Sequence, residues 1–252
     1  MARSLSLALI GYGKMGKMLE KTAESRGHKI KIRIDPREPG SVQNIDVGIL
    51  TDVDVCLEFT EPSSVIDNIH RLVDMGKPVV TGTTGWYQHL DEVKAFVLDK
   101  NGAVLYASNF SPGIHIFQRI IAEAMRLVNY YEQYDVSLHE THHRHKKDAP
   151  SGTAYTIAEI ILDKMERKTS IFEGKPEGVI PESTLQVSSS RCGEIPGIHT
   201  VTIDSSADTI TLTHIARNRE GFALGAVMAA EWLYSKRGFF TMEDVFHDIE
   251  SL

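Results

Sequence analysis

Residues 142–147 are the part of the chain whose side chains are best suited to chemistry. They read His-His-Arg-His-Lys-Lys, which places three histidines, one arginine and two lysines in six consecutive positions. Pro150 and the turn Ser151-Gly152-Thr153 follow, and the turn opens a segment with helical apolar spacing. The N-terminus of a helix presents unpaired backbone N–H groups and favours negative charge. Clustered cations beside it predict a site for a small polyanion, where histidine and lysine can also move protons near neutral pH.

The turn at residues 151–153 predicts a cradle for a carboxylate. Gly152 exposes backbone N–H groups, while Ser151 and Thr153 add hydroxyl donors. Such a turn alone is more often a plain helix cap, and the neighbouring cations are what favour ligand binding. A substrate with two carboxylates could use this cradle at one end and the histidine and lysine side chains at the other.

A metal site is an alternative interpretation of the histidines. Their spacing is not H-E-x-x-H, and no cysteine or second acidic pair lies nearby in the sequence to complete a coordination shell. Arg144 and Lys146 would also repel a divalent cation. We therefore expect anion binding with acid–base chemistry and no metal, and a plain basic surface loop remains a third possibility.

Strand and helix patterns alternate through the first half of the chain. Short apolar runs predict strands, and segments with helical spacing follow them after turns that contain glycine. This order predicts an α/β fold with a doubly wound parallel sheet. The expected strands are 5–10, 29–34, 53–59, 78–81 and 103–107, and the expected helices are 14–26, 64–75, 88–99 and 112–130.

The second half changes character, because several segments alternate polar and apolar residues. These segments predict an inserted α+β domain with an open mixed or mostly antiparallel sheet, against which a helix at 151–168 packs. Residues 168–181 are polar and contain glycine and proline, which predicts a mobile loop. We expect a dinucleotide-binding domain of residues 1–111, completed by C-terminal helices within 220–252, and a substrate-binding and oligomerisation domain of residues 112–219. The alternating segments are 134–139, 184–190, 199–203 and 209–215.

A glycine-rich loop follows the first expected strand and opens the first expected helix. It matches G-x-G-x-x-G in the context that this motif requires, and an acid, Asp35, lies nineteen residues after the last glycine. The pattern indicates a Rossmann-like domain in which Asp35 contacts the ribose hydroxyls. Asp35 favours NADH, but Arg37, with Lys14 across the loop, could tolerate a 2′-phosphate, so both NADH and NADPH are expected. The residues expected to bind the cofactor are Gly11, Tyr12, Gly13, Lys14, Met15, Gly16 and Asp35.

Two further loops follow later strands, where the carboxyl ends of a parallel sheet meet a bound nucleotide. Their glycine, hydroxyl and amide groups suit a nicotinamide carboxamide and its ribose, although each loop taken alone is more often an ordinary connection. The residues expected to contact the cofactor there are Gly82, Thr83, Thr84, Ala107, Ser108, Asn109 and Phe110.

Composition limits the partners and the compartment. The 252 residues contain 34 acids and 27 lysines and arginines, a net charge of −7, which disfavours nucleic acid and anionic membranes as partners. The longest weakly polar stretch, 222–234, is too short to span a bilayer, and the N-terminus lacks the pattern of a signal peptide. Cys56 and Cys192 form no metal-binding spacing, so we expect a reduced compartment, the cytoplasm.

Residues 140–154 carry a specific resemblance. They match the pattern E-x-H-H-x-x-K-x-D-A-P-S-G-T-A and resemble the signature of the 4-hydroxy-tetrahydrodipicolinate reductase family, also called dihydrodipicolinate reductases. The glycine loop and segments 58–60, 82–85, 109–113, 191–199 and 214–223 are also similar to this family. The resemblance implies NAD(P)H-dependent reduction of a cyclic dicarboxylic imine-type substrate on the diaminopimelate route to lysine, by a homotetramer.

The same resemblance implies roles for individual residues. It places His142 at the position for acid–base catalysis and Lys146 at the position of the proton donor. It places His143, Gly152 and Thr153 at substrate-binding positions, and the hydroxyl of Ser151 belongs to the same turn.

Two other functions remain open. One is an NAD(P)-dependent dehydrogenase for an amino acid or a semialdehyde, of which the semialdehyde form lacks a cysteine nucleophile near residues 142–147. The other is a non-catalytic sensor that binds a dinucleotide without turning it over.

Overall fold

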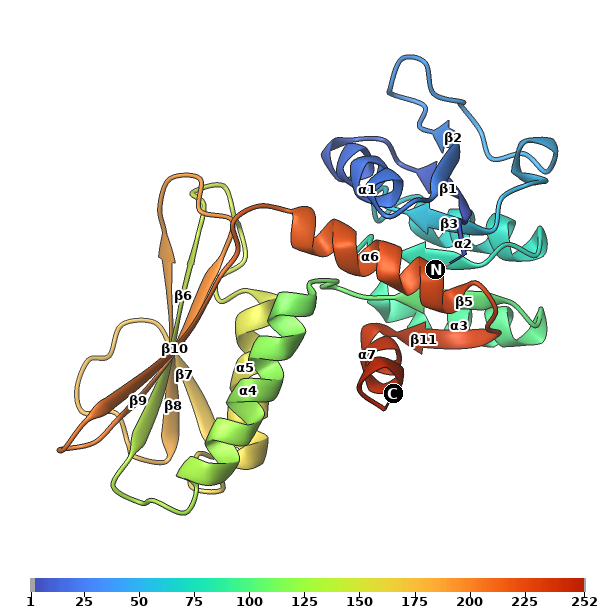
Figure 1. Cartoon of the computed structure of the whole chain (residues 1–252). Coiled ribbons are helices and arrows are strands. Elements are labelled where there is room, and N and C mark those ends of the chain that lie inside the picture. The colour runs from blue at the N-terminus through green and yellow to red at the C-terminus, as the bar shows by residue number, and fades with distance from the viewer. Residues whose placement is uncertain (1–2, 252) are drawn as a thin grey trace. The chain divides into compact units, whose positions relative to one another are not determined.

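The computed structural model describes residues 3–251 (Figure 1), and these divide into two compact units. The first unit contains the described residues up to Ser111 and those from Glu220 onward. The second unit is the intervening segment, Pro112–Arg219.

The first unit is built on a six-stranded sheet in which every strand pair is parallel, so the predicted parallel sheet is confirmed. Its strand order is β11-β5-β4-β3-β1-β2. The edge strand β11 was not predicted, because four residues between two helices give no clear alternation. The strands are β1 (Ser6–Ile10), β2 (Lys29–Ile34), β3 (Val55–Glu58), β4 (Val79–Thr81), β5 (Ala103–Tyr106) and β11 (Gly238–Thr241).

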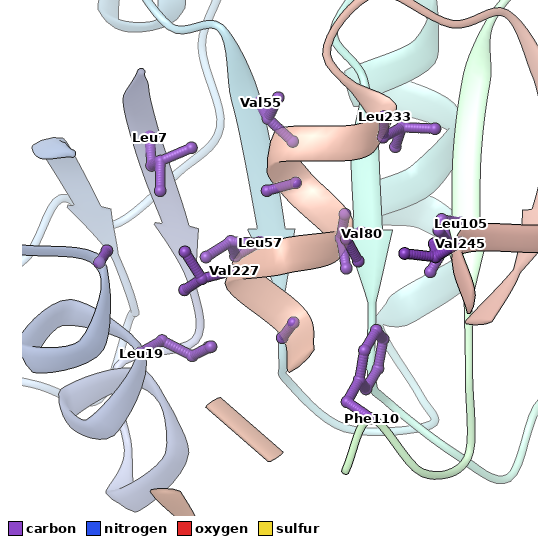
Figure 2. Close-up of a cluster of buried hydrophobic side chains, with 14 of the residues drawn as sticks. Leu7, Leu19, Val55, Leu57, Val80, Leu105, Phe110, Val227, Leu233 and Val245 are labelled. Atoms are coloured by element: carbon purple, nitrogen blue, oxygen red, sulfur yellow. The ribbon is translucent and has the colours of Figure 1, made fainter. Parts of the chain in front are cut away.

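Helices cover both faces of this sheet, as a doubly wound fold requires. Because side chains alternate along a strand, Leu7 and Leu57 face one layer of helices while Ala8 and Cys56 face the other. Figure 2 shows the first layer, where α1, α6 and α7 supply Leu19, Val227 and Val245 among others. The second layer is formed by α2 and α3. The helices are α1 (Lys14–Ser25), α2 (Val65–Asp74), α3 (Leu90–Asp99), α6 (Glu220–Leu233) and α7 (Met242–Glu250), with short 3₁₀ turns at Gly48–Leu50 and Tyr87–His89.

The second unit is built on a five-stranded mixed sheet of order β10-β9-β6-β8-β7. Pairs β6–β9 and β9–β10 are antiparallel, whereas β6–β8 and β7–β8 are parallel. The mixed sheet is confirmed, but the sheet is not mostly antiparallel, because alternation in a sequence gives no strand direction. The strands are β6 (Asp135–His142), β7 (Ser170–Glu173), β8 (Thr184–Arg191), β9 (Ile198–Asp204) and β10 (Thr209–Ile215).

Two helices, α4 (Pro112–Val128) and α5 (Gly152–Lys164), pack on one face of this sheet and enclose its core. Helix α5 ends four residues before the predicted end at Lys168. The expected loop at 168–181 instead begins with strand β7 at Ser170–Glu173.

Strand β6 continues three residues beyond the predicted end at His139. Its inward-facing positions are Val136, Leu138, Glu140 and His142, so the apolar core passes directly into two polar side chains at the end of the strand. Strand β9 is antiparallel to β6 and has the same arrangement. Its inward-facing positions Ile203 and Val201 lie in the apolar core, and toward the start of the strand they are followed by the buried polar side chain of His199. Buried polar residues at the end of a core are candidates for function.

None of the helices between residues 3 and 251 combines the length and the apolar character that a bilayer span requires.

Candidate functional site

In the glycine loop of the first unit, the fold requires glycine at positions 11 and 16 but not at position 13. Gly11 has φ +91°, and a Cβ there would lie 2.2 Å from the carbonyl oxygen of Phe59. A Cβ on Gly16 would lie 2.4 Å from the carbonyl oxygen of Gly11. A Cβ on Gly13, which precedes α1, would have no atom within 4 Å. Gly13 therefore leaves open space at the helix N-terminus, where a phosphate can approach the backbone.

Asp35 lies at the end of β2 and is held by backbone donors. Its Oδ2 accepts a hydrogen bond of 2.7 Å from the N–H of Tyr12, and its Oδ1 accepts one of 2.8 Å from the N–H of Arg37. These bonds join the end of β2 to the glycine loop. Both segments line a cavity of about 330 Å³ at the carboxyl ends of β1, β2 and β3.

The cations expected to accept a 2′-phosphate have different surroundings. Arg37 lines the cavity and pairs with Glu61, with its Nη2 2.8 Å from Oε1 and its Nη1 3.1 Å from Oε2. Lys14 is exposed. The charge of Arg37 is thus partly neutralised by an acid that lines the same cavity.

The ring of Phe59, which follows β3, packs against the loops that follow β4 and β5. Its ring lies so close to Gly82 that a Cβ there would approach it to 2.1 Å, and it packs 5.7 Å from the ring of Phe110. The hydroxyl of Thr83 accepts a 2.8 Å hydrogen bond from the N–H of Thr60. Thr84 is exposed. This loop therefore has structural contacts of its own in addition to its predicted role.

The loop after β5 is only partly accessible. Ser108 is exposed and Ala107 half-buried, whereas Phe110 is buried in the core of the first unit. The side chain of Asn109 accepts a 2.9 Å hydrogen bond from the N–H of Ser111. Tyr12 and Met15 of the glycine loop are half-buried and also pack against this core.

In the second unit, strand register brings together residues that are far apart in the sequence. On β6, Glu140 pairs with Ser189 of β8 on one side and with His199 of β9 on the other. His142 pairs with Arg191 at the end of β8. The end of the sheet thus gathers two imidazoles, a carboxylate and a guanidinium.

Glu140 is the centre of this group and is fully buried. Its Oε1 accepts hydrogen bonds from the N–H of Ser151 at 3.1 Å, the hydroxyl of Ser189 at 2.9 Å and Nη2 of Arg191 at 3.2 Å. Burial opposes the charge of this carboxyl group. The imidazole of His199, 3.7 Å from Oε2, and the hydrogen bonds from Ser151 and Ser189 together outweigh burial and hold its pKa well below the usual range.

His142 lies against the other carboxylate oxygen, with its Nδ1 3.3 Å from Oε2 of Glu140. Its side chain is only 9 % exposed. Burial lowers the pKa of His142 to about 4, although the charge of Glu140 acts in the opposite direction. The imidazole is therefore uncharged near neutral pH, available to accept a proton or a hydrogen bond rather than to act as a cation.

Lys146 lies in the loop after β6 and is partly exposed. Its Nζ is 2.9 Å from both carboxylate oxygens of Asp148. Arg191 holds this loop, because its Nε donates to the carbonyl of Lys146 at 3.3 Å and its Nη2 donates to the carbonyl of Asp148. His143 is half-buried and accepts a hydrogen bond through its carbonyl from the N–H of Lys146. The proposed proton donor thus lies on a loop fixed by a residue from β8.

The Ser151-Gly152-Thr153 turn forms the N-terminus of α5. Ser151 is buried, and its hydroxyl accepts a 3.2 Å bond from the N–H of Ala154, so it caps the helix. Gly152 is exposed and Thr153 half-buried. Ser151 is therefore committed to the fold, while the exposed Gly152 is accessible to a ligand.

Glu140, Arg191 and His199 are among the residues of this site that were not assigned roles from the sequence. These three residues come together only through the pairing of the strands. The alternation of inward-facing residues along β6 is a sequence signal that identifies Glu140 alone. Glu140, His142 and His199 offer potential metal ligands within 4.8 Å of one another. Oε1 of Glu140 already accepts a hydrogen bond from Arg191, and the absence of a metal remains a prediction.

Comparisons with known proteins agree along nearly the whole chain. The families described as "Dihydrodipicolinate reductase, N-terminus" and "Dihydrodipicolinate reductase, C-terminus" match residues 5–110 and 113–246. A 4-hydroxy-tetrahydrodipicolinate reductase of Christiangramia forsetii is 38 % identical over 245 residues, covering 97 % of this chain and 99 % of that protein. One from Archaeoglobus fulgidus is 37 % identical over 249 residues, covering 92 % and 95 %.

A solved structure supports the fold. The dipicolinate-bound dihydrodipicolinate reductase from Paenisporosarcina sp. TG-14 superposes with a TM-score of 0.75 at 22 % identity, covering 96 % of this chain and 99 % of that one. With both family matches and relatives above 30 % identity, the chain belongs to the dihydrodipicolinate reductase family.

Proposed function

We propose that the chain catalyses the NAD(P)H-dependent reduction of 4-hydroxy-tetrahydrodipicolinate to tetrahydrodipicolinate in the diaminopimelate route to lysine. The net reaction adds a hydride and a proton to the cyclic substrate and releases its hydroxyl group as water. One observation carries this proposal: the family signature at residues 140–154 folds into a single site that joins buried Glu140 and His142 to the N-terminus of α5.

The first unit is proposed to bind the dinucleotide. The residues fit this cofactor, because Gly13 leaves open space at the N-terminus of α1 and Asp35 presents a carboxylate to the cavity at the ends of β1, β2 and β3. Bound NAD(P)H supplies the hydride. Gly11 and Gly16 shape the loop, with Tyr12, Lys14 and Met15 between them, and the loops at 82–84 and 107–110 are proposed to contact the nicotinamide end.

Both NADH and NADPH are proposed as cofactors. Asp35 suits the two free hydroxyls of an NADH ribose, whereas Arg37 lines the same cavity and can meet a 2′-phosphate. The pairing of Arg37 with Glu61 weakens this second interaction without removing it, because an exposed ion pair stabilises by only about 0–1 kcal/mol.

The second unit is proposed to bind the substrate and supply the proton. Gly152 and Thr153 bind one carboxylate at the N-terminus of α5, with Ser151 capping the helix, and His143 contacts the substrate. Hydride addition to a C=N system places negative charge on nitrogen, which the ammonium of Lys146 neutralises by proton transfer. His142, uncharged near neutral pH, acts beside it as the second acid–base group.

We also propose that the protein is a cytoplasmic homotetramer assembled through the sheet of the second unit. Ile210 and Ile215 of β10 are 47 % and 61 % exposed, which provides apolar surface for association. The free thiols of Cys56 and Cys192 suit a reducing compartment. Light scattering after size-exclusion chromatography tests the assembly, and a monomeric mass would contradict it.

One assay separates this function from the alternatives. Freshly generated 4-hydroxy-tetrahydrodipicolinate is mixed with the protein and NADH or NADPH, and the absorbance of the reduced nicotinamide is followed. Consumption of cofactor that requires both substrate and protein supports the proposal. Tight cofactor binding without turnover would indicate a sensor, and turnover only with amino acids or semialdehydes would indicate another dehydrogenase.

A further inference from the structure

We infer that Glu140 is the positioning residue of this site, holding His142, the Lys146 loop and the N-terminus of α5 in one fixed arrangement. The inference rests on the proposed function, since it assigns a role within that reaction. Glu140 itself is fully buried and contacts no solvent, so it acts through its neighbours rather than on the substrate.

The burial of this carboxylate requires an explanation, because an uncompensated buried charge is strongly destabilising. One oxygen, Oε1, receives three donors, from Ser151, Ser189 and Arg191. The other oxygen, Oε2, has no hydrogen bond of good geometry and faces two imidazoles. The carboxylate is therefore anchored through Oε1 and directed at the histidines through Oε2.

Oε2 determines which nitrogen of His142 carries the proton. It lies 3.3 Å from Nδ1 of His142, and a carboxylate favours a protonated nitrogen opposite itself. Nε2 of His142 is then left unprotonated, as an acceptor. Other charged or titratable groups act on this ring: His199, whose Nε2 is 3.7 Å from Oε2, together with Lys146 and Arg191, whose charges disfavour a second proton.

Oε1 controls the position of the Lys146 loop through Arg191. The guanidinium that donates to Glu140 also donates to the carbonyls of Lys146 and Asp148. The direct bond from the N–H of Ser151 fixes the start of α5 at the same oxygen. A single carboxylate therefore links His142, the loop of Lys146 and the turn at the N-terminus of α5 that is proposed to bind a substrate carboxylate.

The decisive variant is Glu140→Gln, which keeps the shape and one acceptor oxygen but turns an amide toward His142. An amide donor favours an unprotonated Nδ1, so the tautomer should reverse. We expect kcat to fall about 10–100-fold, the usual effect of removing an orienting partner. The dissociation constant for NADH should stay unchanged, because the cofactor contacts lie in the first unit.

Two measurements distinguish this role from a general structural defect. Nitrogen NMR of the wild-type protein near neutral pH should show His142 protonated on Nδ1, and Glu140→Gln should show protonation on Nε2. The matched control is Ser189→Ala, which removes one donor from Oε1 but keeps the charge and the contact with His142. It should change kcat less than about threefold, well below the loss on removing an orienting partner.

The outcomes are separable. Wild-type protein with His142 protonated on Nε2, or Glu140→Gln with kcat within about twofold of wild type, would overturn the inference, since an orienting partner should be worth more. If the wild-type protein does not reduce the substrate, the proposed function fails. The NMR measurement requires no turnover and no variant, so it still reports on the relationship between Glu140 and His142 in that case.

Discussion

Nζ of Lys146 lies 2.9 Å from each carboxylate oxygen of Asp148, and the lysine side chain is 23 % exposed. The carboxylate of Asp148 holds the ammonium on the loop that Arg191 fixes. A partly exposed ion pair contributes only about 1 kcal/mol or less, so a substrate anion can replace Asp148 at little cost. The ion pair with Asp148 therefore holds the proposed proton donor in place but leaves it accessible to a substrate.

The first prediction concerns this proton donor. Lys146→Ala should lower kcat by roughly 10²–10⁴, the usual contribution of a positioned acid, because it removes the ammonium proposed to neutralise the charge that develops on the ring nitrogen. Steady-state kinetics at saturating cofactor measure the change. The control is Lys147→Ala, the exposed neighbour, which should retain near-normal kcat. Retention of near-normal kcat by Lys146→Ala would remove Lys146 from the mechanism.

The second prediction concerns the carboxylate cradle. Thr153→Val should raise KM for the substrate more than it lowers kcat, because its contact with the substrate is expected already in the ground state. The control is Thr156→Val, one turn later on α5, where the hydroxyl bonds the carbonyl of Gly152. An unchanged KM in Thr153→Val would argue against the cradle.

The fold was largely predictable because the patterns of apolar residues that indicate strands and those that indicate helices are both strong in this sequence. The apolar runs of β1 and β3 are buried on both faces, which is the signature of a parallel sheet covered by two layers of helices. The missed strands β7 and β11 are four residues long and lie at sheet edges. Strand direction in the second sheet could not be predicted, because alternation is the same for parallel and antiparallel pairs.

The candidate site was only partly predictable. His142 and Lys146 belong to a contiguous segment of unusual composition, so sequence alone draws attention to them. His199 and Arg191 lie about fifty residues away and reach His142 only through the pairing of β6 with β9 and β8. Glu140 could have been identified from its inward phase in β6, had the strand been predicted to continue to His142.

The third prediction separates the structural glycines from the binding glycine. Gly13→Ala should leave the melting temperature near that of wild type, since its Cβ meets nothing within 4 Å, but should raise the dissociation constant for NADH by obstructing the phosphates. Gly11→Ala should lower the melting temperature, because φ is +91° and its Cβ would clash with the backbone of Phe59. Unimpaired NADH binding by Gly13→Ala would contradict the assignment of the loop.

The fourth prediction concerns the choice between cofactors. Glu61→Gln should lower the dissociation constant for NADPH about three- to tenfold, because it frees Arg37 and removes a negative charge beside the expected 2′-phosphate, together worth about 1 kcal/mol. NADH binding should change little. Fluorescence titration with each reduced cofactor measures the ratio.

The control for this experiment is Glu123→Gln, which breaks a comparable exposed pair with Arg126 in the second unit. It should leave the ratio of the two dissociation constants unaltered. An equal ratio in Glu61→Gln and wild type would show that the pair of Arg37 and Glu61 does not set the preference.

The fifth prediction concerns stability and pH. Burial lowers the pKa of His142 from 6.5 to about 4, so the folded protein keeps this imidazole neutral while the unfolded chain protonates it below about pH 6.5. Between these values the unfolded state binds more protons. The free energy of unfolding should therefore decrease as pH falls from about 6.5 to about 4, with His142 contributing at most about 1.4 kcal/mol per pH unit.

Glu140 also makes the free energy of unfolding decrease as pH falls, but at lower pH. Its pKa is held below the usual range, so its contribution to stability is lost as pH falls below about 4.5. Urea unfolding at several pH values should give a smaller slope between about pH 6.5 and pH 5 for His142→Gln than for wild type. The control is His139→Gln, on the exposed face of the same strand. If wild type and His142→Gln have equal slopes in this window, the neutral, buried state of His142 is not what makes the folded protein sensitive to acid.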